Sequence, residues 1–192
     1  MARPPHAREK ALRAYLDLLV EGERGATVDA VAARAGISKG GVLYHFPSKD
    51  ALAEAVLERF DEVARADLAA MREDPEGATR NFVRTSWQTD DALEPVYRAT
   101  LRLAHAGHEG ALAALEALHD GWLELITAEV GDPGLAKVVM LIGDGLYHQA
   151  SMPGTWSRQT FADLDDLLAQ VDRLVSPAVS PAVAAGQRPA DR

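Results

Sequence analysis

The chain has 192 residues, 47% of them hydrophobic and 26% charged, which is enough apolar material for a substantial core in one domain or two small ones. It contains no cysteine, which excludes a disulfide framework and a thiolate metal site and agrees with a reducing cytoplasm. No apolar run approaches the roughly 20 residues that cross a membrane, and the first residues lack the apolar stretch of a signal peptide. We therefore expect a cytoplasmic protein without a membrane partner.

The net charge of −9 is distributed unevenly along the chain. Residues 1–60 carry nine Lys and Arg against eight Asp and Glu, whereas residues 61–192 carry eleven against twenty-one. An evenly acidic chain would repel nucleic acid, but here a nearly neutral head precedes an acidic body. The charge therefore leaves nucleic-acid binding by the head open, because such binding depends on where the cations lie.

The first quarter of the chain is predicted to form short helices. Apolar residues spaced three and four apart predict a first helix from about residue 8 to Gly22. Thr27 is a suitable N-cap for a second helix over 28–35, and Asp29 in its first turn favours the helix dipole. Gly36 separates this helix from the segment "ISKGGVLYHF". The chain thus contains two short helices joined by a glycine-containing turn.

The rest of the chain is also predicted to be helical. Ser48 can cap a long fourth helix that continues to about Arg72. Apolar periodicity predicts further helices over about 78–89, 92–106, 109–130, 133–150 and 158–175. The sequence after residue 176 is rich in proline and alanine and is predicted to be disordered. Because no β-hairpin signal and no repeat is present, the predicted fold class is all-α.

Two adjacent glycines, Gly40 and Gly41, weaken the helix that follows the turn by about 1 kcal/mol each. Two helices of about seven residues around a glycine-containing turn have helix-turn-helix proportions. On a face against DNA, the glycines would let the backbone approach the phosphates, and the amides at the helix start would face an anion. Paired glycines are also typical of a loop, and Lys39 or Lys49 alone is typical of a solvated surface. The joint order of these features favours DNA binding.

This order, "GATVDAVAARAGISKGGVLYHFPSKDAL" over residues 25–52, resembles the TetR family of bacterial transcriptional repressors. The resemblance implies three parts: a three-helix helix-turn-helix DNA-binding domain (1–50, with a flexible arm over 1–7), a helical effector-binding and dimerisation domain (51–176) and a disordered tail (177–192). The motif departs from the family at one position. Leu43 stands where the family usually has a tyrosine that contacts phosphate.

The resemblance also implies partners. A homodimer would place its two recognition helices in successive major grooves of a palindromic double-stranded operator, and a small-molecule effector would release it. By matching positions, the DNA face would comprise Thr27, Ser38, Lys39, Gly40, Gly41, Tyr44, His45 and Lys49. Phosphate contacts would position the recognition helix, and Lys39 with the glycine surface would lie nearest the base edges.

Polar tips on apolar helices of the acidic body supply candidate effector contacts. These residues are Trp87, Tyr97, Leu101, His105, His119, Trp122, Met140, Asp144, Tyr147 and His148. Each of them could instead be an ordinary core or surface side chain. Their aromatic and histidine content, with few interior acids, suggests a ring-bearing effector that is uncharged or weakly acidic.

Two apolar stripes near the C-terminus predict a four-helix dimer interface. The candidates are Leu135, Val138, Val139, Ile142 and Leu146 on one helix and Leu164, Leu167, Leu168, Val171 and Val175 on the last helix. Gly143 and Gly145 would allow close helix approach. The same stripes could equally face the chain's own core.

The sequence gives no support for catalysis, a cofactor or a metal site. A Gly-rich phosphate loop, a nucleophile elbow and a HExxH helix are all absent from it. His105 and His108 lie three residues apart, but Gly107 between them favours a helix end over a shared metal-binding face. We therefore expect no enzyme. The alternative function is that of an all-helical ligand carrier or interaction protein whose helix-turn-helix is only structural.

Overall fold

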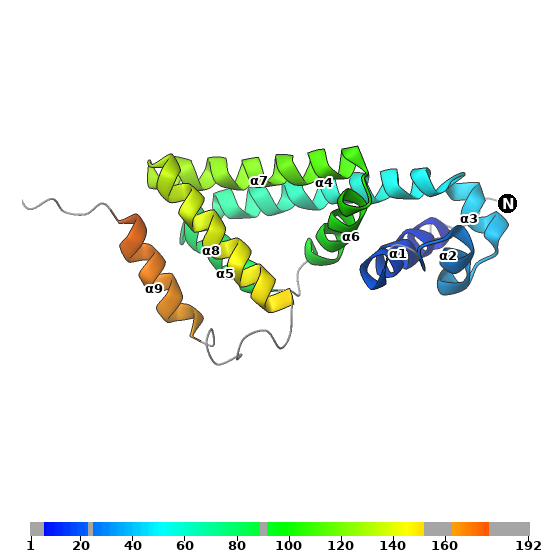
Figure 1. Ribbon diagram of the computed structural model, residues 1–192, viewed down its shortest axis with the longest axis horizontal. Helices are drawn as coiled ribbons and strands as arrows, with labels where there is room; N and C mark the ends of the chain where they lie inside the picture. Colours follow the sequence, from blue (N-terminus) through cyan, green and yellow to red (C-terminus); the bar gives the residue numbers. More distant parts are fainter. Residues whose placement is uncertain (1–5, 23–24, 89–91, 152–162, 177–192) are drawn as a thin grey trace, which may run out of the picture.

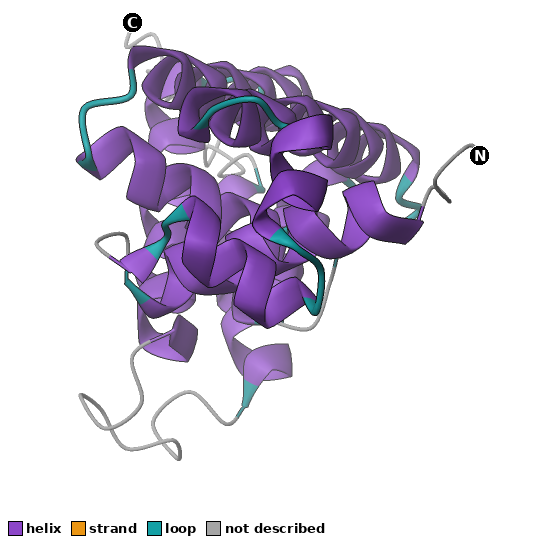
Figure 2. Ribbon diagram, turned by 90° about the vertical axis from the view of Figure 1, so that its right-hand side faces the viewer, coloured by secondary structure: helices purple, strands orange, loops and turns teal. Residues whose placement is uncertain are grey.

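The computed structural model of the chain describes residues 6–22, 25–88, 92–151 and 163–176. In these ranges the regular elements are α1 (His6–Glu21), α2 (Val28–Ala35), α3 (Lys39–His45), α4 (Lys49–Glu73), α5 (Ala78–Trp87), α6 (Glu94–His105), α7 (Glu109–Val130), α8 (Pro133–Ser151) and α9 (Leu164–Val175). Figure 2 shows these helices joined by loops, with no strand among the described residues. The predicted all-α class is confirmed.

The ends of the chain agree only in part with the predicted arm and tail. Because α1 begins at His6, the last two residues of the predicted arm are helical. The rest of the arm and the predicted tail over 177–192 lie outside the described residues. None of the described helices combines the length and the apolar character that a membrane-crossing segment needs.

Polar caps set the helix boundaries near the N-terminus, as the sequence indicates. The hydroxyl oxygens of Thr27, Ser38 and Ser48 each accept a hydrogen bond from the backbone N–H three residues later, at 3.2, 3.0 and 3.0 Å. Gly36 ends α2 in the left-handed conformation at φ 66°, where its N–H donates to carbonyls of the preceding turn. These short-range bonds fix the angle at which α3 leaves α2.

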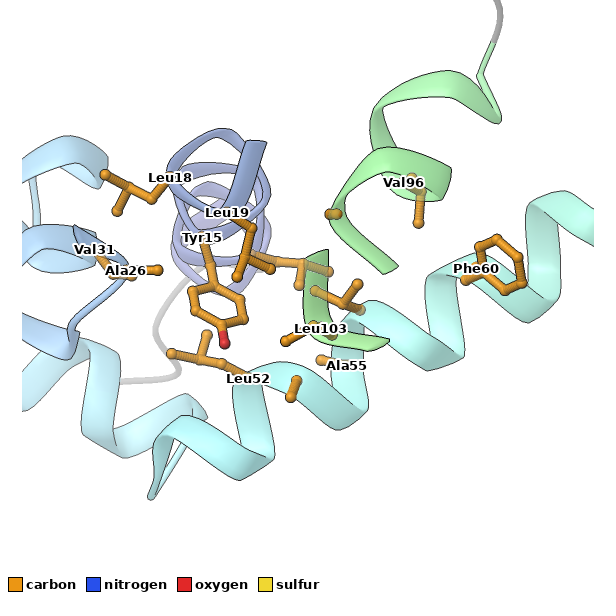
Figure 3. Packing of buried hydrophobic residues seen from close by; sticks show 14 of the residues in the cluster. Tyr15, Leu18, Leu19, Ala26, Val31, Leu52, Ala55, Phe60, Val96 and Leu103 are labelled. Atoms are coloured by element: carbon orange, nitrogen blue, oxygen red, sulfur yellow. The ribbon is translucent and has the colours of Figure 1, made fainter. Parts of the chain in front are cut away.

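A first buried cluster joins α1–α3 to α4, α6 and the start of α7. Tyr15 of α1 is fully buried and points toward Leu52 of α4 (Figure 3). Leu103 of α6, which is 4% exposed, belongs to the same cluster. The cluster runs from residue 11 to residue 118. The domain boundary predicted at residue 50 therefore crosses a continuous core.

A second buried cluster joins the end of α4 to α5, α7, α8 and α9. Phe82 of α5 and Val139 of α8 lie inside it. Trp122 of α7 packs against both clusters. Figure 1 shows the consequence for the shape: α1–α3 lie at one end, α9 lies at the other, and α4 and α7 run side by side between them.

Candidate functional site

The outer face of α3 carries Lys39, Gly40, Leu43 and Tyr44, all exposed, with Tyr44 at 73%. Their spacing places them on one face of the helix. A Cβ added at Gly40 would meet no atom within 4 Å, so the backbone is open to an approaching surface there. The face thus combines one cation, a bare stretch of backbone, an aliphatic side chain and a phenol. Such a helix has the dimensions to enter a major groove.

The opposite face of α3 packs into the first cluster through Val42. Gly41 is also buried there, and its N–H donates to the Ser38 hydroxyl at 3.0 Å. The sequence interpretation placed both glycines against DNA, and the structure corrects it for Gly41. Successive helical residues are turned by about 100°, and Gly41 lies one such step beyond Gly40, on the side of the helix that Val42 buries.

The other predicted DNA contacts surround α3. Thr27 and Lys49 are exposed at the starts of α2 and α4, while His45 is half-buried and packs edge-on against Tyr44 with ring centroids 5.0 Å apart. The Nζ of Lys39 donates to Oδ2 of Asp29 at 2.9 Å. Both partners of this ion pair are mostly exposed, so it contributes at most about 1 kcal/mol. Lys39 can therefore exchange Asp29 for another anion.

A cavity opens where five helices, α4 to α8, converge. It is lined by Asp67, Phe82, Thr85, Ser86, Gln88, Leu93, Glu94, Tyr97, Trp122, Asp144 and Tyr147. Its empty space of about 510 Å³ includes a part that is open to solvent. A hollow with aromatic walls and a few polar groups is typical of a small-molecule site.

The ten predicted effector contacts divide into two groups. Tyr97, Trp122, Asp144 and Tyr147 line the cavity, and His119 adjoins it because its Nε2 lies 3.0 Å from the Tyr97 hydroxyl, within hydrogen-bond distance. The others lie elsewhere: Trp87 and Met140 pack against the second cluster, Leu101 packs against the first, and His105 and His148 are exposed.

Several lining residues were missed by the sequence interpretation. Asp67 is the most informative, because it falls between Ala64 and Met71 on the apolar stripe of α4. A single carboxylate at an inward position was the available signal for a cavity. Ser86 of α5 is similar, since it follows Phe82 by four residues on an otherwise apolar face. In both helices the polar residue lines the cavity, whereas its apolar neighbours pack in the core.

The carboxylates of the cavity differ in their partners. The Asp67 Oδ2 accepts a hydrogen bond from the Trp122 indole N–H at 2.7 Å. Glu94 is bonded to the Tyr147 hydroxyl and lies 3.8 Å from the Arg98 guanidinium. Asp144 has no hydrogen bond or ion pair to any described residue. It is therefore the carboxylate that remains available to a ligand.

Burial and nearby charges shift the pKa values of two residues of the cavity, Tyr97 and Asp144. Burial raises the pKa of Tyr97 to about 12, and the negative charges of Asp144 and Glu94 add to the shift. Although Asp144 is an exposed residue of α8, desolvation of its carboxyl raises its pKa, and the nearby His119 opposes that shift. The expectation of few interior acids is wrong, because three carboxylates line this cavity.

The predicted dimer residues are distributed between core and surface. Val139, Leu146, Leu168 and Val171 are buried in the second cluster, so they have no surface left for a partner, contrary to the prediction. Leu135, Ile142, Leu164, Leu167 and Val175 are half-buried, and Val138 is 43% exposed. The sequence interpretation missed Leu141 and Leu174, which are 70% and 44% exposed. The outer faces of α8 and α9 therefore both carry exposed apolar side chains.

Two family profiles match the sequence. The profile described as "Bacterial regulatory proteins, tetR family" matches residues 17–56, and "Tetracyclin repressor-like, C-terminal domain" matches residues 76–173. The chain belongs to the TetR family. It is therefore a helix-turn-helix transcription regulator of a non-enzymatic family, and the alternative of a carrier with a merely structural helix-turn-helix is set aside.

Known proteins resemble the chain to different extents. The regulator RutR of Escherichia coli K12 is 40% identical over 87 residues, which cover 43% of this chain and 41% of RutR. The multidrug-binding protein EbrR, solved with malachite green, superposes with a TM-score of 0.63 at 23% identity over 88% of this chain and 98% of its own. Salmonella enterica GusR gives 0.58 at 17% identity over 91% and 98%. The two solved structures share the fold of this chain.

Proposed function

We propose that the protein is a homodimeric repressor that binds a palindromic operator through α3 of each subunit and leaves DNA when a small molecule occupies the cavity. The observation that carries this proposal is the exposed face of α3. It offers Lys39, an open backbone at Gly40 and the Leu43 and Tyr44 side chains to a groove, while Lys49 stands beside it. Phosphate contacts position such a helix, and its base contacts select the sequence.

A second copy of the chain is the proposed partner at the C-terminal end. Val138, Leu141 and Gly145 follow one another along a single exposed face of α8, and Leu174 is exposed on α9. A Cβ added at Gly145 would meet nothing within 4 Å, so a helix of the partner could approach closely there. Two such faces related by a two-fold axis would form a four-helix interface. Two-fold symmetry of the protein would then match a palindromic operator.

Two helices could transmit ligand binding to the DNA-binding end. Glu94 and Tyr97 of α6 line the cavity, and Leu103 of the same helix is buried in the cluster that contains α1. The 25-residue α4, about 37 Å long, carries Lys49 at one end and Asp67 at the cavity. An effector that binds more tightly to a shifted arrangement of these helices would change the spacing of the two α3 helices.

Binding to bacterial promoter fragments across a salt series tests the DNA part of the proposal. We expect a footprint over a palindrome and an affinity that falls steeply with salt. Lys39→Ala and Lys49→Ala should each reduce the salt slope by about 2, because the homodimer loses one cation from each subunit. Lys137→Ala, at an exposed position of α8, is the matched control and should leave the slope unchanged. If all three variants bind like the parent, α3 is not the DNA-binding surface.

A further inference from the structure

The cavity combines an aromatic wall with uncompensated negative charge. We infer that it takes an aromatic organic cation, whose flat ring system lies among Tyr97, Trp122 and Tyr147 and whose positive charge lies at the Asp144 carboxylate. This inference rests on the proposed effector role of the cavity and adds the chemical class of the effector.

The aromatic wall is continuous across four helices, α5 to α8. The ring centroids of Phe82 and Trp122 are 5.4 Å apart, those of Trp122 and Tyr97 are 6.3 Å apart, and those of Tyr97 and Tyr147 are 5.4 Å apart. Tyr97 and Tyr147 meet edge to face, at 81°. Rings in this arrangement present both faces and edges, so a flat aromatic ligand can stack on one ring and contact the edge of the next. The negative ring faces also attract a cation.

The charge of the cavity selects the sign of the ligand. Asp67, Glu94 and Asp144 contribute carboxylates, and the described lining residues include no Lys or Arg. Asp67 has the Trp122 indole as a donor, and Glu94 has Tyr147 and the more distant Arg98. Asp144 has no such partner among the described residues. An anionic ligand would be repelled here, and a neutral ligand would desolvate Asp144 without pairing it.

The lining favours an organic cation over a metal ion. Because part of the cavity is open to solvent, a flat ring system can lie against the aromatic wall without being fully enclosed. The described residues contain no group of three His, Asp or Glu side chains placed to hold a metal ion. With one unpaired carboxylate beside several rings, the described part of the cavity suits a single delocalised positive charge better than a compact, strongly hydrated one.

Three probes that share one ring system isolate the effect of charge. N-methylacridinium is cationic, acridine is neutral at pH 7.5, and acridine carboxylate is anionic. Binding of each to the full-length protein can be followed by titration calorimetry and by quenching of tryptophan fluorescence. We expect N-methylacridinium to bind about tenfold more tightly than acridine, with the carboxylate binding weakest.

Substitutions at Asp144 test the assignment of the anionic group. Asp144→Asn should weaken N-methylacridinium about tenfold and should not weaken acridine, whereas Asp144→Lys should make acridine carboxylate the preferred probe. Asp120→Asn, at an exposed position of α7 that does not line the cavity, is the matched control and should change nothing. Because Asp144 is exposed, these variants are expected to fold.

The outcomes separate the ligand class from the effector role. Equal binding of all three probes, or an unchanged preference in Asp144→Lys, would overturn the cation inference while leaving the cavity as an effector site for other ligands. Failure of every probe to bind would overturn the inference as well. Tight, Asp144-dependent binding that does not release operator DNA would support the ligand class and contradict the proposed effector role.

Discussion

Gly143 of α8 lies directly against the side chains of Phe82 and Ser86 of α5. A Cβ added there would lie 2.7 Å from Cζ of Phe82 and 2.8 Å from Oγ of Ser86, and it would be closer still to Cε1 of the Phe82 ring. Carbon atoms in contact are normally about 3.5–4.0 Å apart, so the added methyl group would overlap the ring by about 1 Å. Phe82 is 4% exposed and cannot yield without entering the cavity or separating the two helices.

The expected change in the free energy of unfolding for Gly143→Ala is the balance of two opposing contributions. Overpacking of this kind costs about 1–3 kcal/mol, whereas replacing glycine by alanine inside a helix gains about 1 kcal/mol. Gly40→Ala is the matched control, because a Cβ there would meet nothing within 4 Å, position 40 lies away from the proposed dimer face, and only the gain applies. We therefore expect Gly143→Ala to be about 1–3 kcal/mol less stable than Gly40→Ala. For a chain of this size, the difference corresponds to about 2–12 °C in Tm.

Urea unfolding and thermal scans of both variants at one protein concentration would measure this difference, since the unfolding of an oligomer depends on concentration. A displaced Phe82 would also occupy part of the cavity, so Gly143→Ala should weaken aromatic probes as well. Equal stability of the two alanine variants would refute the close packing of α5 and α8 at Gly143.

Three further substitutions address the cavity and the surface of α8. Asp144→Asn should raise the free energy of unfolding at neutral pH, as measured by urea titration. Because the pKa of Asp144 is raised in the folded state, its ionised carboxylate destabilises the fold above that pKa. The stability gained by the substitution should vanish in acid, where the carboxyl of the parent protein is protonated. Trp122→Phe removes the indole donor to Asp67 and should weaken aromatic probes in calorimetry without changing operator affinity. Leu141→Glu should shift the sedimentation coefficient toward that of a monomer, because it places charges on the exposed apolar face.

Most of the helices could be predicted because local signals in the sequence agree with the packing. Thr27, Ser38 and Ser48 cap helices where the spacing of apolar residues begins, and the structure contains those hydrogen bonds. Gly36 occupies the left-handed position that ends α2. Such signals depend on residues three or four apart, so one sequence is sufficient to find them.

The faces of α8 could not be predicted in the same way. Residues 138–142 are consecutively apolar, so a periodic pattern cannot decide which of them point inward. The choice is made by α5, which packs where Gly143 leaves room for Phe82 and so directs Val139 into the core. Leu141 is thereby turned outward. Contacts between helices far apart in sequence fix this orientation, and the cavity depends on the same contacts.

The small number of cations on the outer face of α3 bears on how a ligand could release the protein. The exposed outer face of α3 carries Lys39 as its cation, and Asp29 already holds this group in a weak ion pair. Operator affinity would then depend on two α3 helices fitting their grooves together more than on total charge. A coupling of about 1–3 kcal/mol, typical of allosteric proteins, lowers affinity by about 5- to 150-fold. Because α6 belongs both to the cavity lining and to the core around α1, a modest shift of α6 would be sufficient for release.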